Sequence, residues 1–376
     1  MGFLALRTPG SMAPPLPLKA RVGNALRESL IPVGRWLSRE QRRELTALAA
    51  YGGLVHQAFH GRPFHPLVCT DVVLEEAWCS FNRLQPTESP ARRERDNAVH
   101  HYGHDVVLKR AAGLPLVGRA LPFMLEHGVN FSDGSSYEDP QPWVRSYLCM
   151  GPHRAARLRN RFKVRGIAVG PYIQYARSVL LEERAAELRQ ELGRTLLVIP
   201  AHTVVNVERR WSAEPLIALI QAHAQQERYD TVIWQSFWKD APPQGLPREW
   251  ILACNGHASN PWFLDCQRTL LELCQGMVAC SLGTHVGYAL ALDRPVLFAP
   301  VEISQDVTAA TALWQQRYSS EWEERTRLME AIGVEPQLDS LQWLDAGRAR
   351  QALDPYFGFE LRCTAAELAR LLRGEA

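Results

Sequence analysis

The chain has 376 residues, of which 46% are hydrophobic and 22% are charged, and its formal net charge is +2. This length accommodates two domains that can each bury a core, and the composition is that of a globular chain rather than a disordered one. The near-zero charge balance provides no broad basic surface for nucleic acid. No apolar run reaches the ~18 residues of a membrane span, and residues 1–12 lack the pattern of a secretory signal.

Residues 1–45 differ from the rest of the chain. Three prolines between Pro14 and Pro17 interrupt regular structure, and apolar residues then recur at helical spacing among arginines from Arg21 to Arg43. We therefore expect a basic helical segment here. Two interpretations stay open, because such a segment can pack on the main body or lie on an anionic membrane surface.

Short apolar runs separated by glycine, proline and helical patterns make residues 46–185 a candidate first α/β domain. The expected strands are residues 67–69, 106–108, 121–123, 147–149 and 167–169, and one helix is expected over 172–193, ending at Gly193.

Strand and helix patterns alternate more clearly over residues 186–345, which predicts a doubly wound parallel sheet. The expected strands are 195–202, 231–238, 250–257, 277–281 and 295–300; the expected helices are 212–226, 260–276, 285–294 and 308–330. Further helices, including 364–372, close the chain over 346–376.

Cysteine and histidine spacing gives no metal signature. The eight cysteines form no Cys-x-x-Cys pair, so we expect reduced, mostly buried thiols and a cytoplasmic chain. Two histidine groups have no accompanying HExxH motif, and packed or solvated histidines explain them better than zinc. These groups are His56, His60 and His65, and His100, His101 and His104.

Polar residues follow the apolar runs of the second half, and ligands of an open parallel sheet gather beyond the carboxyl ends of its strands. The candidate donor- and phosphate-binding residues are therefore His202, Thr203, Lys239, His257, Ser281, Gly283, Thr284 and His285. The turn at 281–285 is the most informative, because a strand ends there and a helix N-terminus with free N–H groups favours an anion. An ordinary strand-to-helix turn is the alternative, since neither a GK[ST] nor a GxGxxG motif is present.

The segment MVACSLGTHVGYALALDRPVLF (277–298) resembles the donor-binding segment of GT-B glycosyltransferases and of the related sugar-nucleotide 2-epimerases. With EHGVNF (126–131), GPYIQYA (170–176) and LLVIPAHT (196–203), it is similar to uncharacterised proteins of bacterial capsule and O-antigen loci that look like GT-B enzymes. The resemblance covers roughly residues 115–300. It implies an α/β fold of two Rossmann-like domains around a central cleft, with helical N- and C-terminal extensions.

The resemblance implies that a sugar passes from a nucleotide-sugar donor to a glycan or lipid-linked acceptor in bacterial surface polysaccharide synthesis. It implies no metal and no cofactor besides the donor, because helix N-termini and basic side chains stabilise the leaving phosphate. Nucleic acid is not an expected partner. A peripheral position on the inner membrane is the alternative to a purely cytoplasmic one.

An inverting transfer also needs a base to deprotonate the acceptor hydroxyl. The segment EHGVNFSDGSSYEDP offers His127 as first choice, because imidazole titrates near neutral pH, with Asp133 and Glu138 as alternatives. A retaining mechanism would not need this base. An epimerase, a glycerol-phosphate transferase and a non-catalytic GT-B-like scaffold all remain compatible with the same fold.

Overall fold

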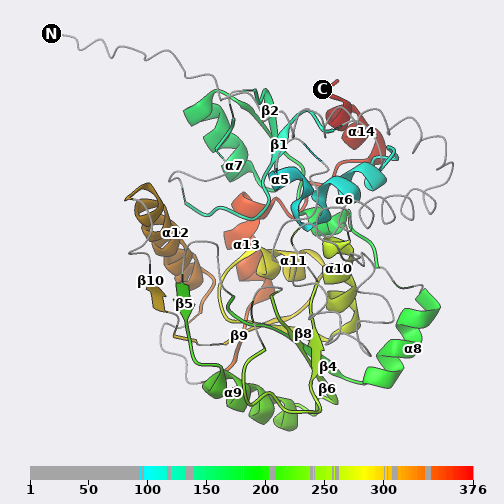
Figure 1. The fold of residues 1–376 in the computed structure, drawn as a ribbon, viewed down its shortest axis with the longest axis vertical. Coiled ribbons are helices and arrows are strands. Elements are labelled where there is room, and N and C mark those ends of the chain that lie inside the picture. The colour runs from blue at the N-terminus through cyan, green and yellow to red at the C-terminus, as the bar shows by residue number, and fades with distance from the viewer. Residues whose placement is uncertain are drawn as a thin grey trace, which may run out of the picture.

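The structure is a computed structural model. It describes residue 94 and residues 97–375, apart from 117–119, 133–138, 142, 179, 181, 203–207, 238–239, 241, 256–257, 259–261, 300, 303, 307–311 and 335–339. The expected helical segment over residues 1–45 and the expected strand at 67–69 lie outside these residues. A three-stranded sheet and a six-stranded sheet occupy opposite halves of the molecule, with α10, α11 and α13 between them (Figure 1).

The first sheet has three parallel strands in the order β1-β2-β3. They are β1 (Met124–Leu125), β2 (Ser146–Cys149) and β3 (Arg165–Ala168), preceded by α5 (Asn97–His100), a 3-10 turn (His101–Gly103) and α6 (His104–Ala111). The crossover from β2 to β3 contains α7 (Pro152–Arg157) and a π-helical turn (Leu158–Phe162). Parallel pairing requires such a crossover, and here a helix supplies it.

The second sheet has six strands in the order β11-β9-β8-β4-β6-β7, of which β11 alone is antiparallel to its neighbour. The strands are β4 (Thr195–Ile199), β6 (Thr231–Gln235), β7 (Ile251–Ala253), β8 (Gly276–Ala279), β9 (Val296–Phe298) and β11 (Gln342–Trp343). Its helices are α8 (Glu182–Leu192), α9 (Ala213–Gln226), α10 (Phe263–Leu273), α11 (Thr284–Ala291) and α12 (Ala312–Ala331), and β5 (Glu208–Arg210) pairs with β10 (Ser304–Asp306) in a separate antiparallel ribbon.

The central strand β4 shows why this sheet is covered on both faces. Leu196 and Val198 pack into the cluster that contains the apolar side of α9, whereas Leu197 and Ile199 pack into the cluster that contains α10 and α11. Successive side chains of a strand point to opposite faces, so a continuous apolar run requires a helix layer on each side. The apolar run at 195–199 therefore correctly predicted a strand that is covered on both faces.

Three predictions in the first half are wrong. Residues 106–108 form part of α6 rather than a strand, because a short, fully buried apolar run has the same composition in either structure. The helix expected over 172–193 is interrupted: a 3-10 turn covers Tyr172–Gln174, and α8 begins at Glu182. The strand expected at 121–123 begins three residues later, at Met124.

The C-terminal helices α13 (Ala346–Phe357) and α14 (Ala365–Arg373) return to the first half, where α13 contacts α7 and α14 contacts α6. A buried ion pair adds to this junction: Arg110 of α6 donates to both carboxylate oxygens of Asp265 of α10, at 2.6 and 2.5 Å. The two sheets therefore share buried contacts. The predicted domain boundaries stay predictions, and the one at residue 186 falls inside α8.

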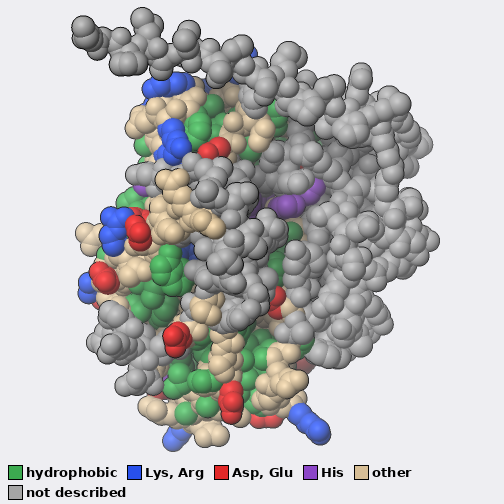
Figure 2. All heavy atoms as spheres, turned by 60° about the vertical axis from the view of Figure 1, so that its left-hand side comes forward, with side chains coloured by type: hydrophobic (Ala, Val, Ile, Leu, Met, Phe, Trp, Pro, Cys, Tyr) green, Lys and Arg blue, Asp and Glu red, His purple; other side chains and the backbone are tan. Residues whose placement is uncertain are grey.

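The surface carries charges of both signs and the core holds most of the described cysteines, as the near-neutral charge balance and the cysteine spacing predict. Figure 2 shows charged side chains of both signs spread over the described part of that face. Of the six cysteines within the described ranges, all are free thiols and five are buried, as the sequence predicted. Among the helices that the structure describes, none combines the length and the apolar character needed to span a membrane.

Candidate functional site

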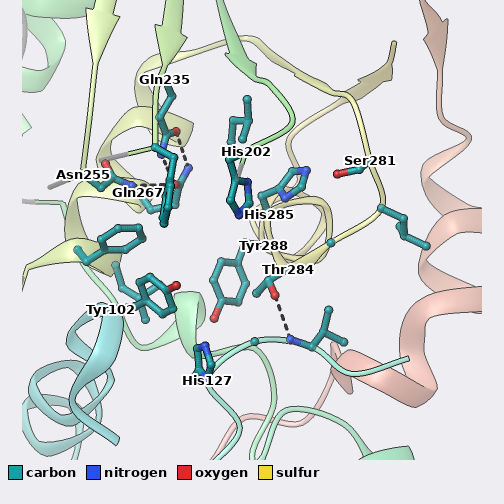
Figure 3. Close-up of a pocket in the computed structure, with 18 of the residues that line it drawn as sticks. Tyr102, His127, His202, Gln235, Asn255, Gln267, Ser281, Thr284, His285 and Tyr288 are labelled. Carbon is teal, nitrogen blue, oxygen red and sulfur yellow. Dashed lines mark hydrogen bonds between the residues drawn. The ribbon is translucent and has the colours of Figure 1, made fainter. Parts of the chain in front are cut away.

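A cavity of about 330 Å³ opens at the carboxyl ends of the second sheet. It lies where the chain order of the strands reverses, because β6 and β7 follow on one side of β4 and β8 and β9 on the other. Such a switch point leaves a crevice in which open α/β sheets bind ligands. The loop after β1 of the first sheet forms the opposite wall (Figure 3).

The structure brings together six of the residues that sequence analysis selected. His127, His202, Ser281, Gly283, Thr284 and His285 all line the cavity. Thr203, Lys239, His257, Asp133 and Glu138 lie outside the described residues. The six shared residues are thus placed, while the roles assigned to them stay predictions.

The turn between β8 and α11 forms one end of the cavity. Gly283 is the residue that caps α11, with extended backbone angles (φ −166°, ψ −172°), and Thr284 is the first residue of the helix. A Cβ on Gly283 would lie 3.1 Å from Cε1 of His285, so glycine leaves room for the imidazole to fold back over the turn. Because the N-cap residue is a glycine, no side-chain hydrogen bond caps this helix. The first N–H groups of α11 lack helical partners and favour an anion.

His285 is held as a neutral imidazole. Burial lowers its pKa to about 3, helped by the nearby charges of His202 and Arg325, while a hydrogen bond to the Ser281 backbone carbonyl acts in the opposite direction. Its Nε2 is buried and has no hydrogen-bond partner, so the donor to Ser281 is Nδ1. With that tautomer, Nε2 is a hydrogen-bond acceptor. His285 thus provides the cavity with an acceptor and no positive charge.

Three side-chain amides line the cavity beyond β6 and β7. Oε1 of Gln267 accepts hydrogen bonds from Nε2 of Gln235 and from Nδ2 of Asn255, each at 2.8 Å, and Nε2 of Gln267 donates back to Gln235 at 3.3 Å. All three side chains are buried. Because each amide fixes its neighbour, the network presents donors and acceptors in a set orientation (Figure 3).

The loop that carries His127 is fastened from within the first sheet. Glu126 is fully buried, and its carboxylate accepts hydrogen bonds from the backbone N–H groups of Asn130 (3.2 Å) and Met150 (3.0 Å). The Glu126 carboxylate therefore stabilises the turn at 126–130, and His127 rather than Glu126 lines the cavity.

The same loop is also fastened from the second half. Glu321 of α12 accepts the backbone N–H groups of Phe131 (3.2 Å) and Ser132 (3.0 Å). Arg325, one turn further along α12, donates to Glu321 at 3.3 Å and lies over the Phe131 ring, 5.7 Å from its centroid. Glu321 and Arg325 both line the cavity. Among the described lining residues, Arg325 is the one lysine or arginine, and it lies next to the loop.

Two tyrosines complete the wall near His127. Burial raises the pKa of Tyr288 well above its ordinary value, and the charges of Glu126 and Tyr102 act in the same direction, so its hydroxyl remains a donor. Figure 3 shows this hydroxyl pointing toward His127. The ring of Tyr102 stacks on His127, with centroids 5.5 Å apart and an interplanar angle of 27°.

Sequence reasoning missed the two tyrosines, the amide network, and Glu321, Trp322 and Arg325. A signal existed for Tyr288, which is four residues after Thr284 and so shares its helix face. Asn255 also had one, because it lies at the polar junction that ends the strand predicted at 250–257, whereas nothing local marked the others. Tyr102 and Gln267 are far from the 281–285 turn along the chain, and only the fold brings them to the same cavity.

Within the described part of the chain, no group of three or more His, Cys, Asp or Glu residues could hold a metal ion. The group of His100, His101 and His104 packs against aromatic rings instead; His104, for example, lies 4.8 Å from the Tyr172 ring, edge to face. The first group, His56, His60 and His65, lies outside the described residues.

No protein-family model matches the sequence. No curated protein matches it either. One solved structure that is similar is ligand-free UGT2, a plant UDP-glycosyltransferase from Phytolacca americana, with 13% sequence identity and a TM-score of 0.27. The match covers 61% of this chain and 51% of the plant chain, so this chain spans about half the length of that protein.

Proposed function

We propose that this chain is a glycosyltransferase of the GT-B type, which moves a sugar from a nucleotide-sugar donor to a hydroxyl of a glycan or lipid-linked acceptor. We further propose that it acts in bacterial surface polysaccharide synthesis. The observation that carries the proposal is the cavity itself: an anion-ready helix N-terminus on one side faces a histidine of the other sheet. These two sides lie in direct contact, because the Val129 N–H donates to the Thr284 hydroxyl at 3.0 Å.

In this proposal the nucleotide side of the donor occupies the cavity edge of the second sheet. The first N–H groups of α11 and the guanidinium of Arg325 stabilise the negative charge that develops on the leaving phosphate oxygen. The neutral His285 accepts a hydrogen bond from a ligand hydroxyl at Nε2, where an orphaned buried acceptor otherwise remains.

His127 receives the acceptor's proton. As the acceptor oxygen forms its bond to the anomeric carbon, the bond from that carbon to the phosphate oxygen breaks, and the hydroxyl proton passes to the imidazole. The nucleoside diphosphate, or the nucleoside monophosphate where the donor is a CMP-sugar, leaves with the bonding electron pair. The placement of His127 at the first-sheet wall, with the anion site opposite, fits a displacement from the face of the sugar away from the phosphate.

A donor-consumption assay tests the proposal. Purified chain is incubated with UDP-, GDP- and CMP-sugars and a lipid extract of bacterial membranes, and nucleotide release is measured. The proposal predicts release with one donor class and its loss in His127→Asn, which keeps a polar side chain that cannot take up the proton. Conversion of a donor to its epimer without acceptor would favour the epimerase alternative. Full release in His127→Asn would remove the assigned base.

A further inference from the structure

Tyr102 has a backbone conformation that the rest of the site must hold in place. Its φ of 57° and ψ of 18° lie in the left-handed region, and the following Gly103 is also left-handed, with a φ of 71°. Glycine adopts this region freely, whereas a residue with a Cβ does so at a cost in free energy. Such conformations persist where surrounding contacts over-determine them, and they cluster at functional sites.

The contacts that hold Tyr102 come from the second half of the molecule. Its backbone N–H donates to the carbonyl of Ala258, in the loop after β7, at 2.5 Å. Its ring packs on Phe263, the first residue of α10, with centroids 4.7 Å apart. The loop after β7 and helix α10 both border the donor side of the cavity. The position of Tyr102 therefore depends on the position of these two elements.

The other contacts of this ring reach the proposed base. Tyr102 stacks on the imidazole of His127, and His101 meets the same imidazole edge-on, with centroids 5.9 Å apart and an interplanar angle of 85°. The two neighbours approach His127 from two directions, and both belong to the 3-10 turn at 101–103. They restrict the rotation of the imidazole about its side-chain bonds.

We propose that Tyr102 is a positioning residue that couples the orientation of His127 to the β7–α10 side of the cavity. This inference rests on the proposed function for its catalytic meaning. The aromatic ring is the part that acts, because the stack and the Phe263 contact both use it. The left-handed backbone aims that ring across the cavity wall, and the Ala258 carbonyl keeps the backbone there.

Two substitutions separate the ring from the hydroxyl and from general stability. Tyr102→Phe keeps the ring and its stacking. Tyr102→Leu keeps an apolar side chain, shorter than tyrosine, and removes the aromatic face. We expect Tyr102→Leu to lower kcat by about tenfold or more, since small misplacements of a reacting group are costly, and to leave nucleotide affinity unchanged. The melting temperature should fall by only a few degrees, because the lost contacts are those of one ring. Tyr102→Phe, which keeps the ring, should lose far less of kcat than Tyr102→Leu.

A spectroscopic measurement keeps the test independent of turnover. In protein carrying ¹³C-labelled histidine, the His127 resonance is identified by its absence in His127→Asn. Stacking on Tyr102 shields that ring, so Tyr102→Leu should move the resonance downfield and Tyr102→Phe should not. An unmoved resonance in Tyr102→Leu, or an equal loss of kcat in both variants, would overturn the positioning role. A moved resonance without any turnover would leave the positioning intact and count against the proposed function alone.

Discussion

The backbone N–H of Val129 donates to the hydroxyl of Thr284 at 3.0 Å, joining the loop after the first strand of one sheet to the first residue of the helix after β8 of the other. One hydroxyl thus belongs to both walls of the cavity. A Cβ on the neighbouring Gly128 would lie 3.5 Å from the same oxygen, so the approach is close without being crowded. The proposed base and the proposed anion site are therefore held at a fixed separation.

Removing that hydroxyl should loosen the junction. Thr284→Val has the same shape but no acceptor, so the Val129 N–H loses its partner in a partly buried site, at a cost of about 1–3 kcal/mol in the free energy of unfolding. Thr284→Ser retains the oxygen and should stay close to wild type. Urea unfolding of the three proteins measures this, and equal midpoints for the valine and serine variants would contradict it.

The buried pair of Arg110 and Asp265 should be strongly coupled. Asp265→Asn leaves a buried guanidinium without a counter-charge, which costs about 3–5 kcal/mol. The backbone N–H of Arg177 also donates to Asp265, at 3.0 Å, so the asparagine keeps one acceptor for it. The matched control is the double variant Arg110→Met with Asp265→Asn, which removes both charges, keeps the acceptor for the Arg177 N–H and should recover most of the loss. Chemical denaturation decides, and a double variant less stable than Asp265→Asn would refute the argument.

Gly287 allows α11 and α13 to approach one another. A Cβ at this position would lie 2.1 Å from Cε1 of Phe357, a fully buried ring. Gly287→Ala should therefore destabilise the chain by about 1–3 kcal/mol through overpacking, although alanine is the better helix former. Adding Phe357→Leu should restore part of the loss by vacating the space. A gain in melting temperature for the single variant would show that the two helices separate without cost.

Acidification should cost stability through His285. The folded protein holds the pKa of this group at about 3, against an ordinary value of 6.5. Below the ordinary value the unfolded chain takes up a proton that the folded chain refuses, so the free energy of unfolding falls as pH drops from the higher pKa toward the lower one. His285→Gln cannot take up that proton. We expect wild type to lose up to about 2 kcal/mol more than the variant between about pH 7 and pH 5. Parallel stability curves for both proteins would contradict the assigned burial.

The sequence predicted the second sheet well because its strands are continuous apolar runs and its helices follow at regular intervals. The strand at 195–199 and the helix starting at Ala213 illustrate this. The first sheet was harder, because β1 has only two residues and carries little pattern of its own. The short apolar run at 106–108 also matched the pattern of a buried strand, and only tertiary packing distinguishes a buried strand from a buried helix there.

The residues of the candidate site also include some that the sequence predicted and some that it did not. Ser281, Thr284 and His285 were predictable because a strand-to-helix turn exposes N–H groups at a known edge of the sheet. Tyr102 was not, since its importance comes from a left-handed backbone and from contacts with Ala258 and His127 that are distant in sequence. The local sequence pattern predicts which polar groups a turn exposes, whereas long-range packing determines which distant side chains face that turn.

Isothermal titration of the purified chain with UDP, GDP and CMP tests the central claim most directly. We predict that one of these nucleotides binds, and that Gly283→Val abolishes the binding, because a branched side chain would displace the His285 ring and cover the N–H groups of α11. Thr284→Ser serves as the control and should retain affinity. Absence of binding by all three nucleotides, or unchanged affinity in Gly283→Val, would contradict the assignment of this cavity as a nucleotide-sugar site.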